Sequence, residues 1–89
     1  MAYRIELDPR ALQELEKIDR QHQERIVSFL RTRLEPLEDQ RSIGQPLKGH
    51  LRQLWKYRLG DFRLICDIQD DVIRILVLRI GHRREVYRR

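Results

Sequence analysis

The chain has one cysteine, three histidines and no long apolar run, and each scarcity excludes a class of protein. A lone Cys66 cannot form an internal disulfide, so the fold needs no oxidising compartment. No apolar stretch approaches the roughly 20 residues of a membrane-spanning helix. Charged residues also interrupt the N-terminus, where a signal peptide would have its apolar centre. We therefore expect a cytoplasmic protein that does not enter a membrane.

Metal-binding and nucleophile motifs are also missing. His22, His50 and His82 are far apart and, with a single cysteine, show no metal-ligand spacing, so we expect neither a metal nor another cofactor. No Gly-rich phosphate loop or Ser/His/Asp motif occurs. We expect His22 and His50 at the surface. His82 is a candidate for acid–base chemistry because the neighbouring Arg83 and Arg84 would lower its pKa.

The composition describes one small, very polar and basic domain. Eighty-nine residues fit a single domain spanning 1–89, with 40% apolar and 37% charged residues. The formal net charge is +5 and the sequence pI is about 10.0. This balance favours a polyanionic partner, which is a nucleic acid, an anionic membrane or an acidic protein. Charge alone does not choose among the three.

The first half of the chain predicts one strand and two helices. Apolar and charged residues alternate over Tyr3–Leu7, the period of a half-buried strand. Helical spacing follows over Pro9–Ile18, and Asp19 is suited to capping a second helix that ends near Pro36. So short a joint predicts a helical hairpin. The polar segment Glu38–Gly49 predicts a loop. The second helix has an apolar stripe of Ile26, Val27, Leu30 and Leu34.

The second half changes to the period of strands. We predict strands at about Leu54–Arg58, Phe62–Ile68 and Val72–Ile80, with hairpin turns at Leu59-Gly60 and Gln69–Asp71. The predicted fold is therefore α+β: an N-terminal strand, a two-helix hairpin and a three-stranded antiparallel meander. The helices pack on one face of the sheet, since nothing else can cover its apolar side.

Alternation divides the predicted meander into an apolar face and a cationic face. A row of cations on an open face suits a phosphate backbone, but Arg and Lys are also ordinary ways to make an exposed face polar. The apolar face would contain Trp55, Tyr57, Phe62, Leu64, Cys66, Ile68, Leu76, Leu78 and Ile80. The cationic face would contain Lys56, Arg58, Arg63 and Arg79, with Arg83 added if the last strand has no bulge.

The order of these elements and several short motifs resemble the RelE/ParE superfamily, the toxins of type II toxin–antitoxin pairs. The likeness begins at Ala2-Tyr3 and Asp8–Leu12 and continues with Leu47-Lys-Gly49 before the second strand. It includes Phe62-Arg-Leu64 and the terminal Gly81–Tyr87. Each motif is weak alone, whereas their joint order covers almost the whole chain. The resemblance implies a single RelE-like toxin domain.

The resemblance implies one of two activities. RelE-like members cut mRNA in the ribosomal A site, whereas ParE-like members poison DNA gyrase and are not nucleases. Lys56, Arg63, Arg83 and Tyr87 match the RelE pattern, which favours a metal-independent endoribonuclease. Leu54 departs from it, because the best-known RelE has a further lysine there. Arg58, Arg79 and Arg84 would then be RNA contacts.

The implied chemistry is attack of a ribose 2′-OH on the neighbouring phosphate, giving a 2′,3′-cyclic phosphate. Arg63 and Lys56 suit the stabilisation of phosphate charge, and Tyr87 or His82 is the candidate for proton transfer. The implied partners are the ribosome, mRNA and a cognate antitoxin that forms a hetero-oligomer with the toxin. An RNA-binding module with a decayed active site is a third interpretation, which the absence of that lysine at Leu54 makes conceivable.

Overall fold

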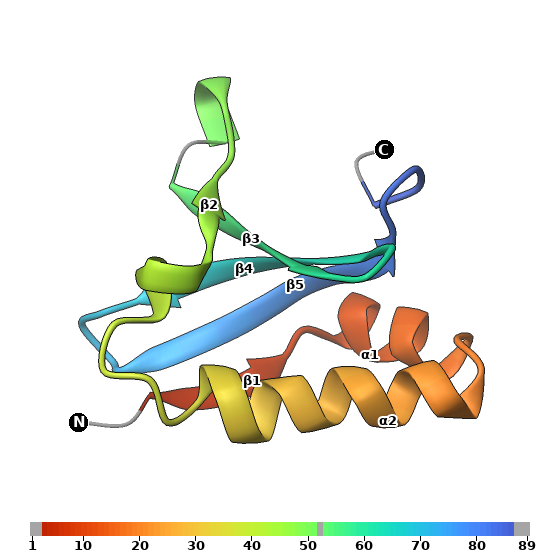
Figure 1. Cartoon of the computed structure of the whole chain (residues 1–89). Coiled ribbons are helices and arrows are strands. Elements are labelled where there is room, and N and C mark those ends of the chain that lie inside the picture. The colour runs from red at the N-terminus through yellow and green to blue at the C-terminus, as the bar shows by residue number, and fades with distance from the viewer. Residues whose placement is uncertain (1–2, 52, 87–89) are drawn as a thin grey trace.

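The computed structural model describes residues 3–51 and 53–86 and has a helical layer beneath a five-stranded sheet (Figure 1). The sheet order is β1-β5-β4-β3-β2. Strand β1 (Arg4–Leu7) pairs in parallel with β5 (Arg74–His82), and the other pairs are antiparallel. Strands β3 (Leu54–Leu59) and β4 (Phe62–Gln69) complete the predicted meander. The predicted α+β fold is confirmed.

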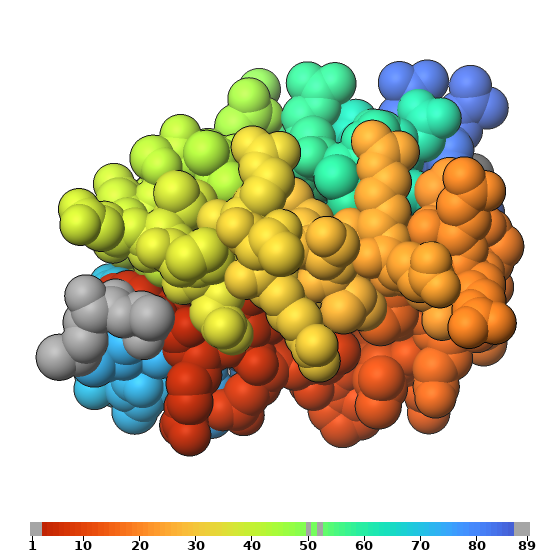
Figure 2. Space-filling view, turned by 60° about the horizontal axis from the view of Figure 1, so that its bottom comes forward, coloured from red at the N-terminus to blue at the C-terminus, as the bar shows by residue number. Residues whose placement is uncertain are grey.

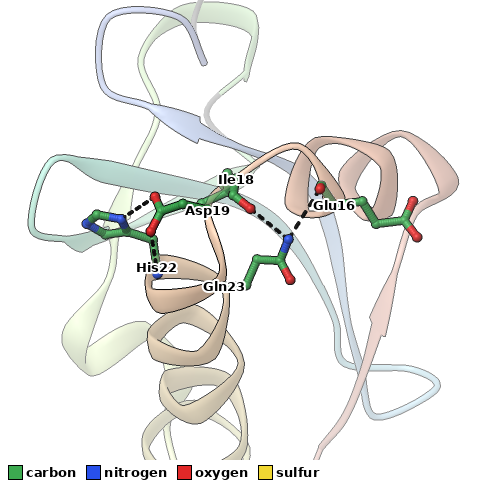
Figure 3. Close-up of polar contacts among 5 residues, drawn as sticks. All are labelled: Glu16, Ile18, Asp19, His22 and Gln23. Carbon is green, nitrogen blue, oxygen red and sulfur yellow. Dashed lines mark hydrogen bonds and ion pairs between the residues drawn. The ribbon is translucent and has the colours of Figure 1, made fainter.

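Two aspartates begin the two helices, as the sequence predicts. Asp8 accepts a hydrogen bond from the backbone N–H of Arg10 at the start of α1 (Pro9–Glu16), and Asp19 accepts one from His22 at the start of α2 (Arg20–Ser28). The short joint between the helices is closed by Gln23, whose Nε2 donates to the carbonyls of Glu16 and Ile18 (Figure 3). These bonds fix the helical hairpin from which one layer is built.

The helical layer continues beyond α2 as a π-helical segment, η1 (Phe29–Leu34). Figure 2 shows this continuous helical stretch lying across the molecule, with α1 and β1 beside it. Its apolar side chains meet the sheet and form the core. The buried core comprises Ala11, Leu15, Ile26, Phe29, Leu30, Leu34, Tyr57, Leu64, Cys66, Ile75, Val77 and Ile80.

The segment predicted as a loop contains three short elements. They are η2 (Gln40–Ile43), β2 (Gln45–Pro46) and η3 (Gly49–Leu51), and β2 forms the edge of the sheet next to β3. The buried hydroxyl of Tyr57 donates to the carbonyl of Gln40 at 2.9 Å, which attaches η2 to β3. The sequence pattern does not predict these short elements, because hydrogen bonds to distant parts of the chain stabilise them rather than local propensity.

The last strand differs from its prediction in two ways. Val72 is 49% exposed and lies with Ile73 in the β4–β5 turn, so β5 begins at Arg74 and runs on to His82. The register also shifts, since Ile65 pairs with Arg79 and Cys66 pairs with Val77. Leu78 is therefore an extra residue, a β-bulge.

The bulge reverses the predicted faces of β5 on its N-terminal side. Ile75 and Val77 are fully buried in the core, whereas Leu76 and Leu78 are only half-buried. Placing Leu76 and Leu78 in the core was therefore wrong, while Ile80, beyond the bulge, is buried as predicted. A one-residue shift moves every earlier side chain to the opposite face. Within the described residues, no helix has the length and apolar character needed to cross a membrane.

Candidate functional site

The candidate site is the sheet face that carries no helices. In Figure 1 this face lies above the sheet, between the β2–η3 segment at one end and the turn after β5 at the other. Arg58 pairs directly with Arg63 across β3 and β4, and Lys56 pairs with Ile65 two residues away. Paired residues of an antiparallel ladder point to the same face. The predicted grouping of Lys56, Arg58 and Arg63 is therefore confirmed.

Arg63 is the most enclosed of these cations, with 7% of its surface exposed. Its Nη1 donates to the carbonyls of Gly60 and Phe62, at 2.8 and 2.9 Å, within the β3–β4 hairpin. No carboxylate of residues 3–51 and 53–86 forms an ion pair with it. A guanidinium held by carbonyls keeps its full positive charge for an external anion. The geometry provides a fixed cation at the β3–β4 hairpin.

Arg83 is brought to the same hairpin through its backbone. Its N–H donates to the carbonyl of Asp61 at 2.7 Å, and Gly81, two residues earlier, pairs with Arg63. The side chains of Arg83 and Arg84 are exposed. The turn is closed by bonds from the N–H groups of Glu85 and Val86 to the carbonyl of His82. Arg83 thus lies at one end of the cationic row.

His82 is not brought together with Arg63. It pairs with Phe62, which packs against the core, and the two ring centroids are 6.3 Å apart. The ring of Phe62 also packs against that of His22 on α2, with 4.9 Å between the ring centroids. Both imidazoles therefore lie on the helix side of the sheet. His82 lines a cleft of about 310 Å³ there, and its Nδ1 accepts a bond from the N–H of Arg84. His82 therefore lies beside Arg84 but on the face of the sheet opposite Arg63.

Arg79 forms an ion pair with the helical layer. Its Nε and Nη2 contact the carboxylate of Glu14 on α1 at 3.0–3.2 Å, and only 19% of its side chain is exposed. Arg79 pairs with Ile65, which pairs with Lys56, so the register of β5 places it on the open face as alternation predicts. What alternation does not reveal is the ion pair with Glu14, which the guanidinium forms with the helical layer.

Arg25 was missed by the sequence prediction, which placed it only on the wet side of the second helix. Its guanidinium Nη1 would lie 3.4 Å from a Cβ added to Gly60, so α2 contributes a cation to the β3–β4 hairpin tip. Helical periodicity marks Arg25 as exposed and cannot show which turn it approaches.

Three further predicted positions complete the comparison of sequence with structure. Leu54 begins β3 opposite Asp67 and is half-buried. Tyr87 lies outside the described residues. His22 is half-buried rather than freely exposed, and its Nδ1 is 2.6 Å from Oδ1 of Asp19 (Figure 3). This hydrogen bond from His22 holds the pKa of Asp19 below its usual value. Among the described residues, no group of three or more His, Cys, Asp or Glu side chains is arranged for a metal.

Known proteins share both the sequence and the fold of this chain. It is 31% identical over 91 residues to Toxin RelG of Mycobacterium tuberculosis, covering 100% of both chains. The toxin–antitoxin complex RelBE2 of the same organism contains a chain with a TM-score of 0.82 and 26% identity, and the match covers 92% of this chain and 99% of that one.

More distant organisms contain the same fold. The isolated RelE toxin of E. coli matches with a TM-score of 0.71 and 25% identity over 91% of this chain and 84% of that one. A chain of the RelE–RelB complex of Pyrococcus horikoshii matches with a TM-score of 0.71 and 27% identity, covering 96% and 99%. The predicted RelE/ParE superfamily is confirmed. Residues 5–87 match the model of the ParE toxin of type II toxin–antitoxin systems, and the chain belongs to that family.

Proposed function

We propose that this toxin is a ribosome-dependent mRNA endoribonuclease. The observation that carries the proposal is Arg63, a nearly buried guanidinium fixed by two carbonyls and paired with no carboxylate of the described residues. Burial of an uncompensated charge is costly, so such a group is kept where it binds an anion. Lys56 and Arg58 point to the same face of the sheet, and the backbone N–H of Arg83 bonds to Asp61 in the same hairpin. A row of cations fits an RNA backbone.

The proposed reaction is a transesterification within the RNA. The 2′-oxygen forms a bond to the neighbouring phosphorus, and the bond from that phosphorus to the 5′-oxygen breaks. A base removes the 2′ proton, and the 5′-oxygen takes up a proton as it leaves. The products are a 2′,3′-cyclic phosphate and a 5′-hydroxyl. Arg63, with Lys56 and Arg83, stabilises the extra negative charge on the pentavalent phosphate.

Proton transfer is assigned to Tyr87 rather than to His82. The imidazole of His82 lies with Phe62 on the helix side of the sheet, away from the phosphate-binding group. Tyr87 follows Arg83 by four residues, and cations near a phenol lower its pKa toward the neutral range. An arginine is a poor proton donor because its guanidinium is effectively always charged.

The proposed partners are the ribosome, mRNA and a cognate antitoxin in the cytoplasm. The relatives named above include toxins in complexes with their antitoxins, among them RelBE2 and the archaeal RelE–RelB pair. The net charge of +5 suits an acidic antitoxin segment as well as RNA. We expect the antitoxin to cover the cationic face in a hetero-oligomer and to order part of its own chain on binding.

The decisive experiment is induced expression followed by mapping of mRNA 5′ ends. The wild type should arrest growth and produce new 5′-hydroxyl ends within translated codons, and purified toxin should make the same cuts on programmed ribosomes. Arg63→Ala with Tyr87→Phe should relieve both effects while the protein stays folded. Arg31→Ala, which removes an exposed arginine from the helical layer, is the matched control. Full toxicity of the double variant would reject these roles.

A ParE-like gyrase inhibitor is the second candidate, and the family match favours it because the matched family is that of ParE. Such a protein binds gyrase and cuts no RNA. A supercoiling assay with purified gyrase separates the two activities. If the protein inhibits supercoiling and leaves translated mRNA intact, it is a gyrase inhibitor and not a nuclease. If it binds ribosomes but neither inhibits supercoiling nor cuts mRNA, it is an RNA-binding module.

A further inference from the structure

One edge of β5 loses its strand partner halfway along. Strand β1 ends at Leu7, which pairs with Val77, and the N–H of Asp8 then donates to the carbonyl of Val77 at 2.8 Å. No strand of the described residues continues along that edge beyond this point. An unpaired backbone N–H in a half-buried position needs another acceptor. The N–H of Ile80 finds one in Oε1 of Glu14, at 2.9 Å.

Glu14 holds a second donor at the same place. Nε of Arg79 contacts both of its carboxylate oxygens, at 3.2 and 3.0 Å, and Nη2 lies 3.0 Å from Oε2. The side chains of Arg79 and Glu14 are 19% and 24% exposed, so water screens the pair only partly. One carboxylate therefore holds two consecutive residues of β5, one through its guanidinium and one through its backbone.

The residues held in this way lead directly to the proposed phosphate site. Gly81 follows Ile80 and pairs with Arg63, and the N–H of Arg83 bonds to Asp61 in the hairpin that also supplies the carbonyls for Arg63. The bulge at Leu78 leaves this part of the strand with a register different from its first half. Glu14 holds the strand immediately after that bulge.

We propose that Glu14 is a positioning residue for the cationic site. It replaces the missing strand neighbour of β5 and thereby fixes where Gly81–Arg83 lie relative to Arg63. This inference rests on the proposed function for its effect on cleavage, but its effect on the strand is independent of any activity. The competing view is that Glu14 only stabilises the helix–sheet contact.

The first test measures amide hydrogen exchange in the purified toxin by NMR. In Glu14→Ala, the amide of Ile80 should exchange about tenfold faster or more, since its charge-assisted hydrogen bond is removed. The amide of Arg83, which bonds to the carbonyl of Asp61, should also exchange faster because the strand that leads to it is no longer held. Glu14→Gln should restore part of the protection, because its amide oxygen still accepts from Ile80. The control is Glu6→Gln, which removes a carboxylate that pairs with Arg74 near the start of β5.

The second test measures single-turnover cleavage on programmed ribosomes, expressed per folded molecule. Glu14→Ala should lower the maximal rate about tenfold and leave the half-saturating toxin concentration within about twofold, because the cations that bind RNA remain. Glu14→Gln should lie between Glu14→Ala and the wild type.

Three results would overturn the positioning role. The first is a maximal cleavage rate in Glu14→Ala that equals that of the wild type. The second is an unchanged exchange rate for the amide of Arg83 while only the global stability falls. The third is a change in Glu6→Gln as large as that in Glu14→Ala. If the wild type itself cuts no mRNA, the proposed function fails and the exchange of Ile80 and Arg83 alone decides whether Glu14 fixes the strand.

Discussion

Arg58 and Arg63 lie directly opposite each other on β3 and β4, so two cationic side chains leave the ladder side by side on the open face. Like charges at directly opposed positions destabilise a sheet. Their pairing therefore opposes folding and favours an anionic ligand. A substitution that removes one of the two charges should therefore stabilise the fold and weaken anion binding.

Replacing Arg58 with glutamate should stabilise the fold and weaken RNA binding. Arg58→Glu places a carboxylate opposite Arg63 and should raise the free energy of unfolding by about 0.2–1 kcal/mol. Urea unfolding measures the gain, and titration with single-stranded RNA measures the lost affinity. Arg31→Glu makes the same charge change on the helical layer and should weaken RNA binding less. Equal losses of affinity in the two variants would mean that the open face is not the binding surface.

Adding a methyl group at Gly44 should be costly. A Cβ there would lie 2.9 Å from Cε1 and 3.1 Å from Cζ of the buried Tyr57 ring. Because this ring is held by the carbonyl of Gln40, Gly44→Ala should lower the free energy of unfolding by about 1–3 kcal/mol. Thermal unfolding measures the loss. The same change in a Tyr57→Leu background should cost less, and an equal cost would contradict the steric cause.

Acid should selectively remove the contribution of Asp70 to the stability of the fold. Hydrogen bonds from Arg41, the larger cause, and from Tyr3 hold the pKa of Asp70 below its usual value. A carboxyl group with a lowered folded-state pKa stabilises the protein above its unfolded pKa of about 3.9, and this stabilisation is lost as the pH falls through the folded value.

The stability difference between the wild type and Asp70→Asn should therefore narrow below about pH 4. Urea unfolding from pH 6 to pH 3 measures this difference. Asp71→Asn, at the exposed neighbouring position, is the control and should show a smaller pH dependence. If the stability difference widened in acid instead, the pKa of Asp70 would be raised rather than lowered by folding.

The thiol of Cys66 should react only when the protein unfolds. Cys66 is fully buried, and burial raises the pKa of its thiol, which disfavours the reactive thiolate. Labelling with a disulfide reagent should be slow in native buffer and complete within seconds in concentrated urea. Rapid stoichiometric labelling of the native protein would show that this part of the core opens readily.

Local sequence determined most of the secondary structure and the shared face of the cations on β3 and β4. Asp8 and Asp19 begin the helices because their side chains satisfy free N–H groups wherever they occur. Lys56 and Arg58 are two residues apart and Tyr57 lies between them. Because a strand has a period of two, this order put the two cations on one face of β3 and Tyr57 on the other. These signals act within a few residues and need no knowledge of neighbours.

Tertiary structure alone decided the faces of the first half of β5. The bulge at Leu78 placed Ile75 and Val77 in the core, whereas Ile80, beyond the bulge, is buried as alternation predicts. A bulge is stable because of the strand and helix on either side of it, so the chain's own alternation carries no sign of it. Alternation thus specified which cations of β3 and β4 share the open face, whereas packing against β4 and α1 decided which side chains of early β5 are buried and that Arg79 pairs with Glu14.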